Sequence, residues 1–255
     1  MYQLHSRELK KGIILELAVP MRHEPSDRAE MVNQLLYGEQ YEILEQEEKW
    51  IRIKTIHDSY EGWVDRKQHS ENKFELLEGD YCNAYVTLKH KQRGELSLTP
   101  GSFLPSKEIL SDFNFEIVEY NQVRKNLREA CMLFQNAPYL WGGRTPYGID
   151  CSGFTQLVFR IIGVSIPRDA SEQVELGEQI LFIEESNEGD LAFFDNAEGK
   201  ITHVGIIRKE NGVHKIIHAS GRVRIDNLDH NGIYNEETQS YSHKLRTIKK
   251  INNGK

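Results

Sequence analysis

The chain has 255 residues, of which 38% are hydrophobic and 28% charged, and its formal net charge at pH 7 is −7. This composition is typical of a soluble globular protein, and the negative charge argues against nucleic acid and against an anionic membrane surface as partners. The length allows one large domain or two to three small ones.

The sequence also bears on the compartment. No apolar run approaches the roughly 18 residues of a membrane span, and residues 1–8 lack the apolar core of a secretory signal. The three cysteines are widely spaced and form neither a disulfide framework nor a CxxC metal pair. We therefore expect a reducing, cytoplasmic location and no membrane partner.

The first 70 residues are predicted to be rich in short strands. Residues 12–19 are β-rich, and this strand is expected to end at Pro20. Three more strands are predicted at 41–44, 50–56 and 62–64, and Trp50 to Lys54 alternates in the manner of a half-buried strand. Short strands at this spacing predict a small barrel.

One helix is expected between the first two of these strands. Ser26 is a suitable N-cap, the apolar positions Val32, Leu35 and Leu36 follow it, and Gly38 is a plausible end. Residues 71–118 are less distinctive, with strands expected at 81–88 and 95–98, and they are compatible with a second, degenerate barrel.

From Glu119 the pattern becomes helical. Apolar residues recur at helical spacing up to Phe134, which predicts an amphipathic helix with Cys131 in its apolar face: Val123, Leu127, Ala130, Cys131 and Phe134. Pro138 closes this helix, and a loop rich in glycine and aromatic residues follows it.

That loop leads to Cys151, which precedes a second apolar-periodic segment comprising Phe154, Leu157, Val158, Ile161 and Ile162. Cys151 is therefore predicted at a helix N-terminus, where unpaired N–H groups and the helix dipole favour the thiolate. Its neighbours Asp150, Ser152 and Gly153 are polar or small, which is unusual around a buried apolar cysteine. We interpret Cys151 as a nucleophile.

The remainder of the chain is predicted to be mostly antiparallel strands. Asp169 is a possible cap for a brief helix, and strands are expected at 189–194, 201–208, 213–219 and 243–251. A helical block followed by antiparallel strands is an α+β pattern, without the alternation that builds a parallel sheet.

A base for Cys151 is sought among ten histidines, of which seven, including His243, lie in polar or terminal stretches and are expected at the surface. Asn211-Gly212 predicts a two-residue type I′ turn that pairs Glu210 with Val213. In this register His203 and His218 project from the same sheet face as diagonal neighbours, close enough for their rings to hydrogen-bond.

His203 is thus the predicted base and His218 the residue that orients it. Two other interpretations remain open, namely two polar residues on an exposed strand face and a zinc site formed with Cys151. The zinc site would lack the short paired spacing of structural zinc ligands. We expect no metal and no cofactor.

These motifs resemble a known family. Tyr139-x-Trp141-Gly142-Gly143 followed by Asp150-Cys151-Ser152-Gly153, with Thr202-His203-Val204-Gly205-Ile206 later, is similar to the signature of NlpC/P60 cysteine peptidases, which cut peptidoglycan peptides. Tyr41 to Leu44, Trp50-x-x-Ile53 and Tyr60 to Val64 resemble a bacterial SH3 domain.

The resemblance implies a papain-like α+β catalytic domain preceded by one or two SH3-like barrels. The domains expected are 1–70 for the SH3-like domain, 71–118 for a second, degenerate one, and 119–255 for the peptidase. Chains of this arrangement resemble γ-D-glutamyl-L-diamino acid endopeptidases of the dipeptidyl-peptidase VI type. These release L-Ala-γ-D-Glu from freed peptidoglycan stem peptides with an unblocked N-terminal L-Ala.

Such selection implies an anionic site for the ammonium group, for which Asp150, Glu24 and Tyr60 are candidates. Candidate donors to the γ-D-glutamate carboxylate are Ser152, Ser171 and Arg168, and Trp141 is grouped with the substrate-binding candidates. Tyr139 either supplies an oxyanion donor or packs under the loop. The alternatives are a hydrolase of intact peptidoglycan, a wall-peptide binding protein and an acyltransferase. The sequence leaves the diamino acid and the oligomeric state open.

Overall fold

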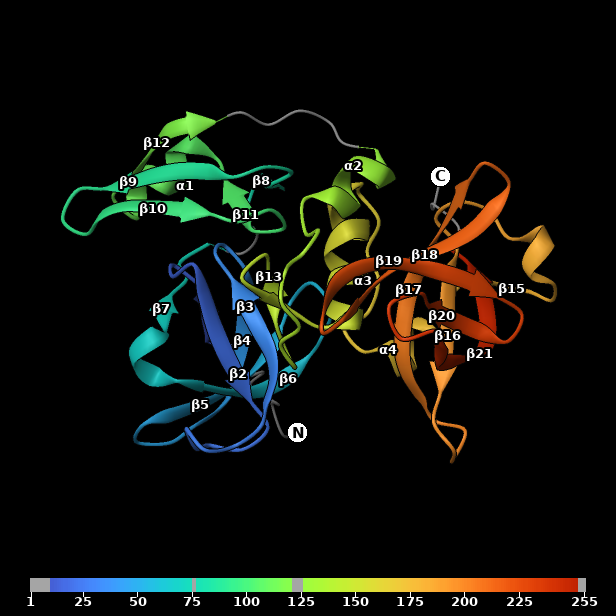
Figure 1. Cartoon of the computed structure of the whole chain (residues 1–255). Helices are drawn as coiled ribbons and strands as arrows, with labels where there is room; N and C mark the ends of the chain where they lie inside the picture. Colours follow the sequence, from blue (N-terminus) through green and yellow to red (C-terminus); the bar gives the residue numbers. More distant parts are fainter. Residues whose placement is uncertain (1–9, 75–76, 121–125, 252–255) are drawn as a thin grey trace, which may run out of the picture. The chain divides into compact units, whose positions relative to one another are not determined.

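The computed structural model describes residues 10–74, 77–120 and 126–251 (Figure 1). Within these ranges, the residues before 81 form one compact unit together with 86–98 and 102–120. A second unit comprises residues 81–85, 99–101 and the residues after 120. The domain boundaries expected at 70/71 and 118/119 stay predictions.

The first unit begins with a seven-stranded antiparallel sheet in the order β3-β2-β6-β5-β4-β1-β7. Its strands are β1 (Lys11–Ile13), β2 (Ala18–Arg22), β3 (Met31–Leu36), β4 (Gln40–Gln46), β5 (Trp50–Thr55), β6 (Glu61–Asp65) and β7 (Ser70–Glu71), with the 3-10 turn η1 (Arg66–Gln68) before β7. In β5, Ile51 and Ile53 are buried while Arg52 is exposed, as the alternation predicted. This is the expected SH3-like domain, packed around an aliphatic core with Tyr41.

The helix predicted around Val32 is wrong. These residues form β3, and their pairing with β2 joins Ala18 to Leu36 and Met21 to Asn33. Three apolar residues separated by three positions and by one, Val32, Leu35 and Leu36, are too few to distinguish a helix from a short strand. Pairing with the neighbouring strand β2 decides for the strand. Gly38, at φ 80°, turns the chain into β4 instead of ending a helix.

The rest of the first unit contains two small sheets. One has the order β10-β9-β12 and the other pairs β11 with β8. The elements are β8 (Gly79–Tyr81), β9 (Val86–His90), β10 (Gly94–Leu98), β11 (Phe103–Pro105), α1 (Lys107–Asp112) and β12 (Phe115–Tyr120). The single strand expected at 81–88 is wrong, because residues 82–85 separate β8 from β9 and the two pair with different strands.

The second unit has the helical block and the antiparallel sheet expected of an α+β domain. The block contains α2 (Leu127–Met132), β13 (Arg144–Thr145), β14 (Gly148–Ile149), α3 (Cys151–Ile161) and α4 (Ala170–Gln173). The helix predicted to reach Phe134 ends earlier, in turns, and Val123 lies outside the described residues. Cys131 is buried as expected.

The sheet of this unit closes on itself. Its order is β15-β21-β16-β17-β18-β19-β20, and β20 also pairs with β21, so six strands form a closed barrel. The elements are β15 (Glu178–Ile180), the 3-10 turn η2 (Ile183–Glu185), β16 (Leu191–Asp195), β17 (Ile201–Glu210), β18 (Val213–Ser220), β19 (Arg222–Asp229), β20 (Gly232–Asn235) and β21 (Ser240–Lys250). Figure 1 shows α3 lying beside this barrel, where it packs against β17 and β18.

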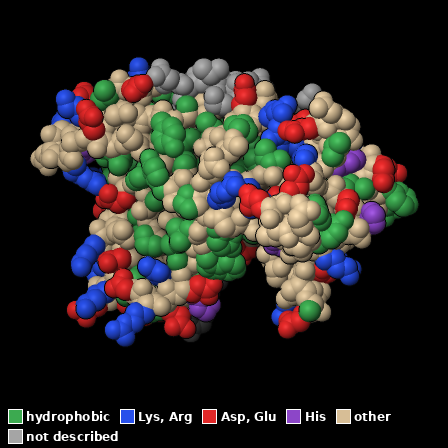
Figure 2. Space-filling model, in the orientation of Figure 1, with side chains coloured by type: hydrophobic (Ala, Val, Ile, Leu, Met, Phe, Trp, Pro, Cys, Tyr) green, Lys and Arg blue, Asp and Glu red, His purple; other side chains and the backbone are tan. Residues whose placement is uncertain are grey.

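The helices and the charged surface bear on contact with a membrane or with a charged partner. None of the helices in the described ranges is long and apolar enough to cross a membrane. On the face drawn in Figure 2, basic and acidic side chains are interspersed, and the described residues there form no large region of one sign.

Candidate active site

Cys151 is the first residue of α3, as the sequence predicted. The preceding residue, Asp150, is the N-cap, and its carboxylate accepts a hydrogen bond of 2.6 Å from the N–H of Gly153. A β-carbon at Gly153 would lie 2.5 Å from the carbonyl oxygen of Gly143, so only glycine allows the loop to lie this close to the helix. The Gly-rich loop and the helix start therefore hold each other in place around Cys151.

The Asp150 carboxylate is fully engaged in holding this arrangement. It accepts the N–H of Gly142 at 2.8 Å, and Arg168 donates to its two oxygens at 2.5 and 3.0 Å. Arg168 also donates to the hydroxyl of Ser152 at 2.8 Å, and all three side chains are buried. Asp150, Ser152 and Arg168 therefore bind one another in the structure, and contact of Asp150 with a substrate ammonium stays a prediction.

The thiol lies against β17 on both sides of His203. It donates to the carbonyl oxygen of Thr202 at 4.0 Å, and the N–H of Val204 hydrogen-bonds to the sulfur. Burial raises the pKa of the Cys151 thiol to about 12, and the charge of Asp150 adds to this effect. Burial thus opposes the preference for the thiolate that the helix N-terminus provides.

The hairpin that carries the two histidines has the predicted register. Asn211 and Gly212 have φ values of 51° and 80°, as a type I′ turn requires, and the pairing runs from Glu210↔Val213 to Ile206↔Ile217. Nε2 of His203 lies 2.7 Å from Nδ1 of His218, and both side chains are buried. The histidines are therefore not an exposed polar pair.

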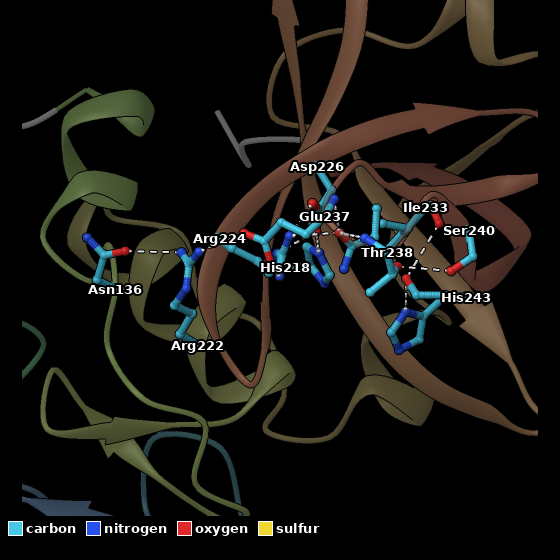
Figure 3. Close-up of polar contacts among 12 residues, drawn as sticks. Asn136, His218, Arg222, Arg224, Asp226, Ile233, Glu237, Thr238, Ser240 and His243 are labelled. Atoms are coloured by element: carbon cyan, nitrogen blue, oxygen red, sulfur yellow. Dashed lines mark hydrogen bonds and ion pairs between the residues drawn. The ribbon is translucent and has the colours of Figure 1, made fainter.

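The polar chain continues beyond the pair that the sequence predicted. Nε2 of His218 lies 3.0 Å from Oδ2 of Asp226 on β19. Arg224 contacts both oxygens of Asp226, with Nε 2.8 Å from Oδ2 and Nη2 2.9 Å from Oδ1, and Figure 3 shows this arrangement reaching Glu237. Burial alone would raise the pKa of Asp226, but hydrogen bonds from His218 and Arg224 lower it below its usual value.

Sequence reasoning missed Asp226 because it did not identify β19. A signal was available in Ser220-Gly221-Arg222, a tight turn that pairs His218 with Arg224 across the next hairpin. Once that register is known, the polar residues of β19 fall beside the histidines.

His243 is the second residue of this site that was not expected. It was predicted at the surface, but its ring stacks on that of His203, with centroids 4.1 Å apart and an interplanar angle of 21°. Burial lowers the pKa of His243 to about 4, and that of His203 falls well below its usual value because of burial and the two neighbouring histidines. Both imidazoles are therefore neutral near pH 7.

The remaining candidates are spread over both units. Tyr139 is 37% exposed, and burial, together with the negative charges possible at Cys151 and Asp150, raises its pKa to about 12. Trp141 and Ser171 are exposed residues of the second unit. In the first unit Glu24 is exposed, and Tyr60 packs on the barrel core. Contact of these residues with substrate stays a prediction.

The alternative of a zinc site formed by Cys151, His203 and His218 has no support in the described part of the structure. In the described ranges, no group of three or more His, Cys, Asp or Glu side chains is placed to hold a metal ion. The facing nitrogens of His203 and His218 instead hydrogen-bond to each other.

Comparison with known proteins agrees with this geometry. Residues 136–242 match the model of the NlpC/P60 family, and residues 21–68 match the bacterial dipeptidyl-peptidase SH3 domain. The chain carries an NlpC/P60 domain preceded by an SH3 domain of this kind. NlpC/P60 proteins are peptidases, and a cysteine nucleophile is general in the family.

Among curated proteins, the chain is similar to a γ-D-glutamyl-L-lysine dipeptidyl-peptidase of Bacillus subtilis, at 26% identity over 68% of each chain. It is also 26% identical to dipeptidyl-peptidase 6 of Lysinibacillus sphaericus, over 72% of this chain and 81% of the relative. The crystal structure of an NlpC/P60 family protein from Bacillus cereus has the same fold. It aligns with a TM-score of 0.73 and 19% identity over 94% of this chain and 99% of that one.

Proposed function

We propose that this protein is a cysteine peptidase that cleaves the amide bond between γ-D-glutamate and a diamino acid in peptides derived from peptidoglycan. Its substrates carry a free N-terminal L-Ala, and its product is L-Ala-γ-D-Glu. One observation carries the catalytic part of this proposal: the buried, hydrogen-bonded pair of His203 and His218 lies on a hairpin whose first strand contacts the thiol of Cys151.

The reaction is an acyl transfer. Nδ1 of His203 takes the proton of the Cys151 thiol as the sulfur attacks the amide carbonyl, and the same nitrogen then protonates the leaving amine. Water, activated by His203, next hydrolyses the thioester. A neutral imidazole is needed to accept the first proton, and the lowered pKa of His203 is consistent with this.

Two donors are proposed for the oxyanion. The first is the backbone N–H of Cys151, since the first N–H groups of a helix have no partner within it. The second is the hydroxyl of Tyr139, whose raised pKa keeps it protonated at neutral pH and therefore able to donate.

The substrate part of the proposal is supported by the two relatives, whose names specify a γ-D-glutamyl-L-lysine bond and a dipeptidyl-peptidase activity. A role in recycling such peptides in the cytoplasm is supported by the three free cysteines, which suit a reducing compartment.

The test is mass spectrometry of the purified protein incubated with L-Ala-γ-D-Glu-L-Lys, the matching diaminopimelate peptide, and the N-acetylated form of each. Release of L-Ala-γ-D-Glu from the free-amine peptides alone is expected, and Cys151→Ala should release none. Equal cleavage of acetylated peptides would contradict selection for a free N-terminus. Cleavage of cross-linked peptidoglycan but not of the free peptides would favour the wall hydrolase.

A further inference from the structure

A carboxylate lies at the far end of the histidine pair. Asp226 is only 7% exposed, and Arg224 contacts both of its oxygens. We propose that Asp226 is a positioning residue that fixes which nitrogen of each histidine carries the proton. This inference rests on the proposed function, because it assigns the base nitrogen of His203.

The direction of the hydrogen bonds follows from Asp226. An ionised carboxylate can only accept, so the proton between Asp226 and His218 belongs to Nε2 of His218. In a neutral imidazole one ring nitrogen donates and the other accepts, so in the proposed arrangement Nδ1 of His218 accepts. The contact of 2.7 Å between the rings therefore places a proton on Nε2 of His203 and leaves its Nδ1 bare.

Arg224, which is itself paired with Glu237, holds the carboxylate of Asp226 in the orientation in which it accepts the N–H of His218. The side chain of Arg224 is 14% exposed and also donates to Glu237 at 3.0 Å and to the side-chain oxygen of Asn235 at 3.1 Å. Figure 3 shows His218, Asp226, Arg224 and Glu237 together in one network of dashed contacts. With Arg224 on both oxygens, Asp226 stays ionised and cannot rotate away from His218.

The same carboxylate stabilises the charge that forms during the reaction. When the Cys151 proton moves to Nδ1 of His203, the ring becomes a cation. The hydrogen bonds from Nε2 of His203 to His218 and from Nε2 of His218 to Asp226 stay in place. We call His203, His218 and Asp226 the relay. The negative charge of Asp226, which is separated from His203 by the ring of His218, attracts the new positive charge on His203 and so stabilises it. The other ionisable groups facing the relay are His243 on β21 and Arg224 on β19, with Glu237 beyond Arg224.

The first experiment needs no variant. Nitrogen-15 NMR of the full chain labelled at histidine should show, at pH 7, His203 and His218 both protonated at Nε2 and not at Nδ1. A proton on Nδ1 of His203 would overturn the proposal, whether or not any peptide is cleaved.

The second experiment compares Asp226→Asn with Asp229→Asn, a matched change on the same strand outside the relay. An amide at position 226 directs an NH2 group toward either Arg224 or His218, so the tautomers are no longer fixed. The rate of alkylation of Cys151 by iodoacetamide at pH 7, followed by mass spectrometry, is expected to fall about tenfold in Asp226→Asn, and kcat about 10- to 100-fold. Asp229→Asn should match the wild type.

These readouts separate the two proposals. If the wild type cleaves none of the peptides, the proposed function fails, while alkylation and NMR still decide the role of Asp226. If the wild type cleaves peptide and Asp226→Asn equals it in kcat, alkylation rate and NMR spectrum, the role of Asp226 is refuted and the function stands. A general loss of structure in Asp226→Asn would instead expose all three buried thiols, Cys82, Cys131 and Cys151, to iodoacetamide and abolish the dispersed histidine signals, and the wild-type NMR result then decides.

Discussion

Arg168→Met tests the assignment of Asp150 and Arg168 to the support of the site. Arg168 is 1% exposed and donates twice to Asp150. Methionine fills much of the same volume without a charge, so Asp150 would remain buried with the N–H groups of Gly142 and Gly153 and the hydroxyl of Ser152 as its donors. Removal of one partner from a buried ion pair costs about 3–5 kcal/mol, and we expect the free energy of unfolding to fall by this amount.

The assay is urea unfolding followed by circular dichroism and by the fluorescence of Trp141, in a background where Trp50 and Trp63, both in the first unit, are phenylalanine. Arg222→Met is the control, because the Arg222–Glu237 pair spans 3.3 Å at the surface and should contribute at most about 1 kcal/mol. Asp150→Asn combined with Arg168→Met should lose less than the sum of the single changes, since no buried charge is left alone. A loss under 1 kcal/mol for Arg168→Met, equal to the control, would refute the reasoning.

Three further changes test the site. His243→Phe keeps a ring beside His203 but cannot titrate. The folded protein disfavours the protonated form of His243, so the stability that this histidine contributes is fully present above pH 6.5 and is lost as the pH falls toward 4. In urea unfolding, the free energy of unfolding of His243→Phe should therefore decline from pH 7 to pH 4 by about 2 kcal/mol less than that of the wild type, after allowance for partial exposure. An equal decline would contradict the assigned pKa. Gly205→Ala places a β-carbon 2.9 Å from Cβ of His218 and should cost about 1–3 kcal/mol in unfolding free energy and most of the peptidase activity, whereas unchanged kinetics would show that the strand yields. Tyr139→Phe should lower kcat about 100-fold with little change in KM, and a change in KM alone would argue against an oxyanion role.

What could be predicted from the sequence is what local geometry determines. Asn211-Gly212 fixes the turn, the turn fixes the register, and the period of two then brings His203 and His218 to the same face. The start of α3 is equally local, because Asp150 caps it through the N–H of Gly153, three residues away.

The features that sequence reasoning missed depend on contacts between distant segments. His243 reaches His203 only because β21 returns to pair with both β16 and β20 and closes the barrel. Nothing in the residues around His243 indicates that closure, so a polar stretch suggested an exposed strand. The thiol is a similar case, because its burial by β17 is not visible from the residues around Cys151.

The missed features also explain how the site can react from a neutral resting state. A Cys151 thiol with a raised pKa and a His203 imidazole with a lowered pKa keep the reacting pair uncharged, so proton transfer from sulfur to nitrogen must create two new charges in a buried site. The helix start and the N–H of Val204 stabilise the negative end, and both are close to Cys151 along the chain or in the adjoining strand. In our proposal Asp226 stabilises the positive end, and only barrel closure brings it there. Loss of Asp226 should therefore slow the reaction by disfavouring the charged pair and leave the resting, neutral site largely intact.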